Sequence, residues 1–90
     1  MLTDPKQVYT ARQVLLAARR AYTINWDNRK IVNEHAQGFT SHALQLDGID
    51  PEKSTPKTPV TVQSIVDAAW DMMGAECTDR LMDALEDQHA

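Results

Sequence analysis

Apolar side chains recur at steps of three and four residues along most of this 90-residue chain, which restricts the folds open to it. This spacing puts side chains on one face of an α-helix, whereas a half-buried strand needs strict alternation of apolar and polar residues. No segment alternates clearly enough to predict a strand, so we expect an all-α protein. The first apolar seam contains Val8, Ala11, Leu15, Ala18 and Tyr22.

The first half of the chain is expected to form a helical hairpin over residues 3–48. Its first helix begins with Pro5, after Thr3 or Asp4 as the N-cap, because proline loses nothing where no backbone donor is needed. The pattern is then interrupted only weakly, and Asn25 is expected to cap the second helix.

The second helix is expected to end at Asp47-Gly48, where glycine accepts the left-handed conformation common after a helix. Gly38 inside it costs about 1 kcal/mol relative to Ala, so either another backbone approaches closely there or the helix bends or breaks. An alternative to the hairpin is one long rod through both segments. Its apolar seam would pack against a second copy of the chain.

Residues 49–58 are rich in proline and polar side chains and form the one evident linker. A C-terminal helical hairpin is expected over residues 59–89. Thr58-Pro59 starts its first helix, Gly74 ends it, and the last helix covers about 75–88. The chain is therefore expected to be a single domain, a small bundle of about four helices built from two antiparallel hairpins.

Charge is divided by position along the chain. Through Gly48 there are six basic and four acidic side chains, a balance of +2, and from Ile49 onward three basic and nine acidic ones, a balance of −6. Because net charge governs association and solubility rather than topology, this division bears on the partners of the protein.

Acidic side chains of the second half recur at helical spacing, forming a stripe along the last helix and a pair on the third. Like charges at these steps weaken a helix by about a few tenths of a kcal/mol each, which favours a use for them. They could dock a protein partner with a basic surface or imitate the phosphates of nucleic acid, whereas the alternative is solubility alone. The candidate docking residues are Asp67, Asp71, Glu76, Asp79, Asp83, Glu86 and Asp87.

The third helix is apolar around much of its circumference, more than a single core seam requires. It is therefore either central in the bundle or covered by another chain, and we favour a homodimer interface or a groove for a partner. Trp70 and Met73 are the expected apolar anchors, since Trp and Met are enriched in adaptable interfaces.

The alternative function is nucleic-acid binding through the basic face of the first two helices. Arg, Asn and Gln side chains can read base edges bidentately, and a helix carrying them near its start suits the major groove. Asp27, Glu34 and the net charge of −4 oppose this interpretation, since they repel phosphates. The residues of this alternative are Arg19, Arg20, Arg29, Asn33 and Gln37.

No catalytic, cofactor or metal motif is present, so a non-enzymatic protein is expected. Paired carboxylates can hold a metal ion for phosphate chemistry, but only Arg80 would stand beside them. His35 and His42 are two helical turns apart, too far to share one ion without other ligands. Cys77 is the only cysteine, and we expect a buried, inert thiol.

A single cysteine and the absence of a signal-peptide pattern or a long apolar run indicate a cytoplasmic protein with no membrane segment. Small size, acidity and the lack of catalytic motifs favour a regulator or inhibitor that binds another protein, such as a product of a phage or other mobile element.

Overall fold

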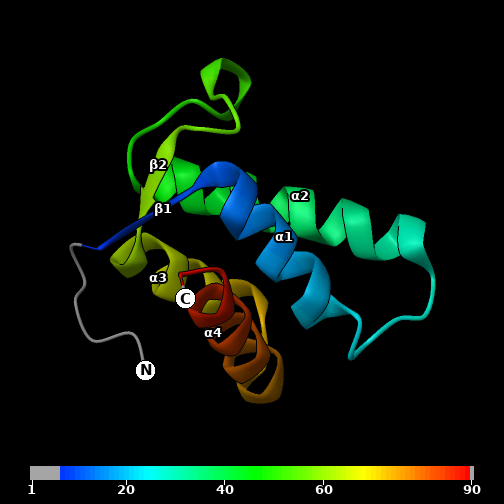
Figure 1. Cartoon of the computed structure of the whole chain (residues 1–90). Coiled ribbons are helices and arrows are strands. Elements are labelled where there is room, and N and C mark those ends of the chain that lie inside the picture. Colours follow the sequence, from blue (N-terminus) through cyan, green and yellow to red (C-terminus); the bar gives the residue numbers. More distant parts are fainter. Residues whose placement is uncertain (1–6, 90) are drawn as a thin grey trace.

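A computed structural model describes residues 7–89, and it confirms the all-α class with four helices and one small added sheet (Figure 1). The elements in chain order are β1 (Val8–Thr10), α1 (Ala11–Tyr22), α2 (Arg29–Leu46), a 3-10 turn η1 (Pro51–Lys53), β2 (Pro59–Thr61), α3 (Val62–Met72) and α4 (Ala75–His89).

Two short strands are the part of the fold that the sequence did not predict. β1 pairs antiparallel with β2, Tyr9 lies opposite Val60, and both side chains are buried. The helices expected to start at Pro5 and at Thr58-Pro59 would have included residues 8–10 and 59–61, so the prediction is wrong for these two segments. The proposed cap at Thr3 or Asp4 lies outside the described residues. Apart from Pro59, the residues of both segments are β-branched or aromatic, which favours the extended conformation.

Each strand leads straight into a helix through a threonine cap. Thr10 accepts from the backbone N–H of Gln13, whose side chain accepts from the N–H of Thr10, a complete capping box. Thr61 caps α3 in the same position, by accepting from the N–H of Ser64. The first residues of α1 and α3 therefore lie at least three positions later in the chain than the first residues expected from the sequence.

α1 and α2 are two separate helices rather than one rod. The cap of α2 is Asn28, not Asn25: the Asn28 side chain accepts from the backbone N–H groups of Lys30 and Ile31. α2 runs on through Gly38, and a Cβ at this position would meet no atom of another element within 4 Å, so neither a close backbone contact nor a break explains this glycine. Gly48 has the expected left-handed backbone, with a φ of 75°.

The helices pack with α1 at the centre. α1 contacts α2 on one side and α4 on another, and α3 packs against α2. α3 and α4 follow each other directly in the chain but make few contacts with each other. The C-terminal segments therefore obtain most of their support from the N-terminal hairpin, and the side of α3 toward α4 is left largely uncovered.

Small side chains let the helices approach closely, and a few large ones fill the centre of the core. Most buried residues of α1 are alanines, whereas Phe39 of α2, Ile65 of α3 and Leu81 of α4 are fully buried. The last helix buries Cys77, as expected from the sequence, together with Leu81, Ala84 and Leu85, which follow it at helical spacing.

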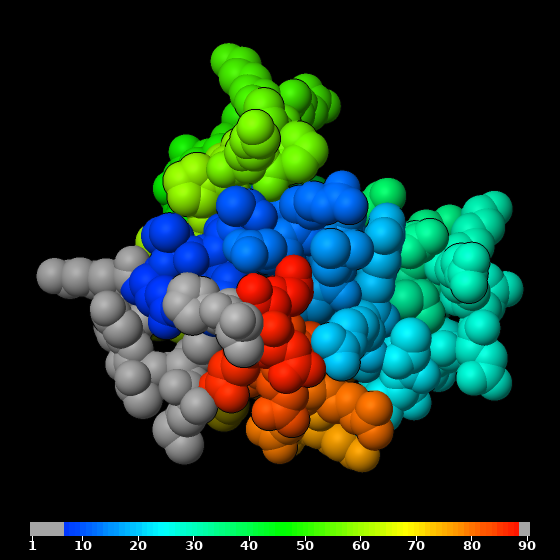
Figure 2. Space-filling model, viewed as in Figure 1, coloured from blue at the N-terminus to red at the C-terminus, as the bar shows by residue number. Residues whose placement is uncertain are grey.

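The linker carries the turn η1 and is anchored at both ends. At its end, the backbone carbonyls of Pro56 and Thr58 accept from the N–H groups of Arg12 and Ala11, which have no partner within α1. At its start, Asp47 accepts hydrogen bonds from Thr61 and Ser64. In the space-filling view the green linker stands out from the body of the molecule (Figure 2).

Candidate functional site

A groove between α3 and α4 collects apolar side chains that the core does not cover. Trp70 of α3 is 86% exposed and Val66 is 38% exposed. With Met82 of α4 they line a hollow of about 610 Å³. A smaller hollow adjoins it at Trp70 and includes Met73. The two expected anchors, Trp70 and Met73, thus lie in one groove, which we call the α3–α4 groove.

Three of the predicted acidic residues line this groove. Asp79, Asp83 and Glu86 lie at steps of four and three on α4 and share the larger hollow with Trp70. Asp79 and Asp83 are exposed, and within residues 7–89 neither forms an ion pair. Burial raises the pKa of Tyr9, and the nearby Glu86 carboxylate raises it further. The groove therefore combines an apolar floor with an anionic rim.

The other four predicted acids lie outside the α3–α4 groove. The Asp71 carboxylate lies 2.9 Å from the His42 Nε2 on α2, and Asp67 accepts from the side chain of Gln63. The Asp87 carboxylate lies 3.4 Å from the Arg20 Nη2 on α1. Glu76 is exposed in the first turn of α4. The seven carboxylates thus form more than one cluster.

Four of the five residues of the nucleic-acid alternative surround a second cleft, between the end of α1 and the start of α2. Its volume is about 540 Å³. Gln37 does not belong to it and lies farther along α2. The residues that line this cleft, called the arginine cleft below, are Arg19, Arg20, Thr23, Trp26, Asp27, Arg29, Val32 and Asn33.

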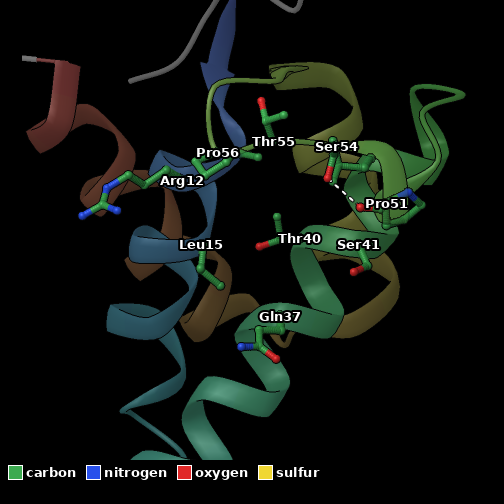
Figure 3. A pocket seen from close by; sticks show the side chains of 11 residues that line it. Arg12, Leu15, Gln37, Thr40, Ser41, Pro51, Ser54, Thr55 and Pro56 are labelled. Atoms are coloured by element: carbon green, nitrogen blue, oxygen red, sulfur yellow. Dashed lines mark hydrogen bonds between the residues drawn. The ribbon is translucent and has the colours of Figure 1, made fainter.

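Gln37 lines a third cavity of about 410 Å³, which the linker forms against α1 and α2 (Figure 3). Its hydroxyl groups are largely engaged within the chain: Thr40 donates to the carbonyl of Ala36, and Ser54 donates to that of Pro51. The side chain of Arg12 extends away from the cavity. No nucleophile and base converge on it among the residues that line it.

The histidines and the cysteine have structural surroundings. His35 is an exposed residue whose ring borders the core: its centroid lies 5.5 Å from that of the buried Tyr22, and the ring stacks on Trp26 with 4.2 Å between centroids and 7° between planes. Cys77 is buried as expected, and burial raises the pKa of its thiol. Within the described part of the chain, no three His, Cys, Asp or Glu side chains come together to hold a metal ion.

Comparisons with protein families, with curated proteins and with solved structures gave no match for this chain. Among residues 7–89, no helix is long and apolar enough to cross a membrane.

Four residues of the α3–α4 groove were not predicted as site residues: Val66, Ala75, Thr78 and Met82. For three of them, spacing carried the signal: Val66 is one turn before Trp70 on α3, and Thr78 is one turn before Met82 on α4. Both pairs lie beside the core seam of their helix. What the sequence could not provide was the separation of α3 from α4, which depends on where α1 and α2 place them.

Proposed function

We propose that this protein is a non-enzymatic regulator or inhibitor that binds a basic, amphipathic segment of another protein in the α3–α4 groove. The observation that carries the proposal is the exposure of Trp70 beside an acidic rim. A largely exposed tryptophan with apolar neighbours is an expected energetic centre of an interface, because burying it removes a large apolar area from water.

The shape and charge of the groove favour a helical partner. From Thr78 to Glu86, α4 rises about 12 Å, or about two helical turns, which matches two or three turns of a partner helix. Apolar side chains of that helix would contact Trp70 and Met82. Lys or Arg beside them would face Asp79 and Asp83, and an Arg could also stack on the indole ring.

The test uses a designed Lys/Leu amphipathic peptide of about four turns and a Glu/Leu peptide with the same apolar face. In a Trp26→Phe variant, Trp70 is the only tryptophan and reports directly from the groove. We expect the basic peptide to shift Trp70 emission to shorter wavelength, and the acidic peptide to leave it unchanged. Added salt should weaken the binding, because the rim charges are exposed.

The groove variant is the double reversal Asp79→Lys/Asp83→Lys, and the control away from the groove is the single reversal Glu52→Lys, on an exposed residue of η1. The double reversal should weaken binding of the basic peptide about tenfold, since two exposed charges at about 0.7 kcal/mol each amount to about 1.4 kcal/mol. Glu52→Lys should bind as the unaltered protein does. Equal effects of the two variants, or no response of Trp70 to the basic peptide, would refute the proposal.

A second copy of the chain is the competing occupant of the groove, and the same reporter separates the two cases. If the groove is covered by self-association, Trp70 emission shifts with protein concentration alone and light scattering gives a dimer. If a basic partner is required, the protein without peptide stays monomeric and its emission does not depend on concentration.

A further inference from the structure

The arginine cleft brings three guanidinium groups together on a protein whose net charge is −4. Arg19 and Arg20 come from the last turn of α1, and Arg29 is the first residue of α2. The turn between the helices folds back so that both ends face one space. Only one carboxylate, that of Asp27, lines the cleft beside them.

Most of this positive charge has no partner among the residues that the structure describes. Arg19 has a buried Nε that makes no hydrogen bond within residues 7–89, and neither Arg19 nor Arg29 forms an ion pair there. Arg20 lies 3.4 Å from Asp87, but both side chains are more than 60% exposed, so water screens this pair and its contribution is small. Three like charges around one cleft therefore favour an anion in it.

The remaining side chains of the cleft indicate which kind of anion. Arginine forks match the oxygens of a phosphate group. Trp26 is held in place by the stacked ring of His35 and contributes an aromatic surface to the wall. Asn33 offers an amide that both donates and accepts, and Asp27 can accept from a hydroxyl or amino group. The volume of about 540 Å³ is within the range of small-ligand sites.

We propose that the arginine cleft binds a nucleotide, with the phosphate on the arginines and the base at Trp26 and Asn33. The nucleotide is either free or one unit of a single-stranded nucleic acid, since both present the same phosphate and base. This site is separate from the α3–α4 groove and does not depend on the function proposed for that groove.

A Trp70→Phe variant tests the proposal, because Trp26 is then the only tryptophan. The probes are adenosine monophosphate, adenosine, inorganic phosphate and a six-nucleotide single-stranded DNA, each followed by Trp26 fluorescence and by calorimetry. We expect adenosine monophosphate to quench Trp26 and to bind at least about tenfold more tightly than adenosine or phosphate alone. If the DNA binds more tightly than adenosine monophosphate, the site is one for single-stranded nucleic acid. If the DNA binds more weakly, the site is one for the free nucleotide.

Two neighbouring substitutions provide the control. Arg29→Gln and Lys30→Gln each remove one positive charge from the first turn of α2, and both residues are exposed, but only Arg29 lines the cleft. Arg29→Gln should weaken the binding of adenosine monophosphate about tenfold, and Lys30→Gln should weaken it less than about twofold. Equal losses in the two variants would mean that general charge attraction, not the cleft, binds the ligand. Equal affinity for adenosine and its monophosphate, or no binding of either at millimolar concentration, would overturn the proposal.

Discussion

The carboxylate of Asp47 links the end of α2 to the start of α3, and its removal tests how the two halves of the chain are held together. It accepts from the backbone N–H of Thr61 at 2.8 Å, from the Thr61 hydroxyl at 2.8 Å and from the Ser64 hydroxyl. The Asp47→Ala variant leaves all three donors without this acceptor. Ser64 is buried and Thr61 is half-buried, so water replaces the lost bonds only in part.

Hydrogen bonds to a charged acceptor contribute about 1.5–3 kcal/mol each, but these three are not additive. The Thr61 hydroxyl lies within 3.2 Å of the Ser64 hydroxyl, so the two can partly satisfy each other once the carboxylate is gone. We therefore expect Asp47→Ala to lower the free energy of unfolding by about 2–3 kcal/mol. Urea denaturation followed by circular dichroism at pH 7 measures this loss.

The control is Asp67→Ala, which removes the same charge from an exposed position where one side chain, Gln63, donates to the carboxylate. Its effect should stay within about 0.5 kcal/mol, as for most surface substitutions. If Asp47→Ala cost no more than Asp67→Ala, the hydrogen bonds seen at Asp47 would not stabilise the fold.

The same residue predicts a dependence of stability on pH. Burial alone would raise the pKa of Asp47, but the hydrogen bonds from Ser64 and Thr61 outweigh it and hold the pKa below its ordinary value. The ionised form is therefore favoured by folding. Its contribution is complete above the unfolded pKa of about 4 and is lost as the pH falls through the lower, folded pKa. The stability difference between the unaltered protein and Asp47→Asn should shrink below about pH 4.

Two further predictions concern the core. Phe39→Ala should lower the free energy of unfolding by about 3–5 kcal/mol in the same urea assay, because Phe39 is fully buried and is the only phenylalanine; a loss below about 1 kcal/mol would contradict this packing. Burial, with a smaller effect from Cys77, raises the pKa of Tyr22 to about 12, so folding favours the neutral phenol. Stability should fall above about pH 10, where unfolded tyrosine ionises; ultraviolet absorbance showing normal ionisation of Tyr22 in the folded protein would contradict this.

The helices were predictable because their apolar spacing is local information. The helical repeat alone places Val32, Ala36, Phe39 and Ala43 on one face of α2, and all four are buried, as are the residues at the same repeat on α4. The repeat also places Leu46 on that face of α2, but Leu46 is 45% exposed at the end of the helix. The strands were not predictable from periodicity, because three residues are too few to show alternation. Val8 fitted the helical seam by spacing alone, yet it is a strand residue with a largely exposed side chain.

The helix starts could have been predicted better from capping chemistry than from proline. Thr10 followed three residues later by Gln13 is the pattern of a capping box, and it marks the observed start of α1. Proline at position 59 instead begins a strand whose backbone pairs with β1. A proline after a threonine suits both a helix start and a short strand, so only the long-range partner decides between them.

The candidate sites required knowledge of how the helices pack, since each is formed where two helices meet or fail to meet. Asp67 and Asp71 share the spacing of the stripe on α4 in sequence, but α3 turns them away from the groove, and Asp71 faces His42. Conversely, Arg19 and Arg29 are ten residues apart and meet because the turn brings the two helix ends together. Residue types were predictable, whereas their grouping was not.

Arg20 lies between the two proposed sites, because it lines the arginine cleft and shares a further hollow with Asp83 of the α3–α4 groove. It also contacts Asp87 of α4, because α1 packs between α2 and α4. An exposed pair of this kind contributes less than about 1 kcal/mol, so an anion in the cleft can draw Arg20 away at little cost. Asp87 would then add its charge to the acidic side of α4. A nucleotide should therefore strengthen binding of a basic peptide, by about fivefold at most, and the peptide should strengthen nucleotide binding equally. An unchanged peptide affinity at saturating nucleotide would show that Arg20 does not exchange between the two sites.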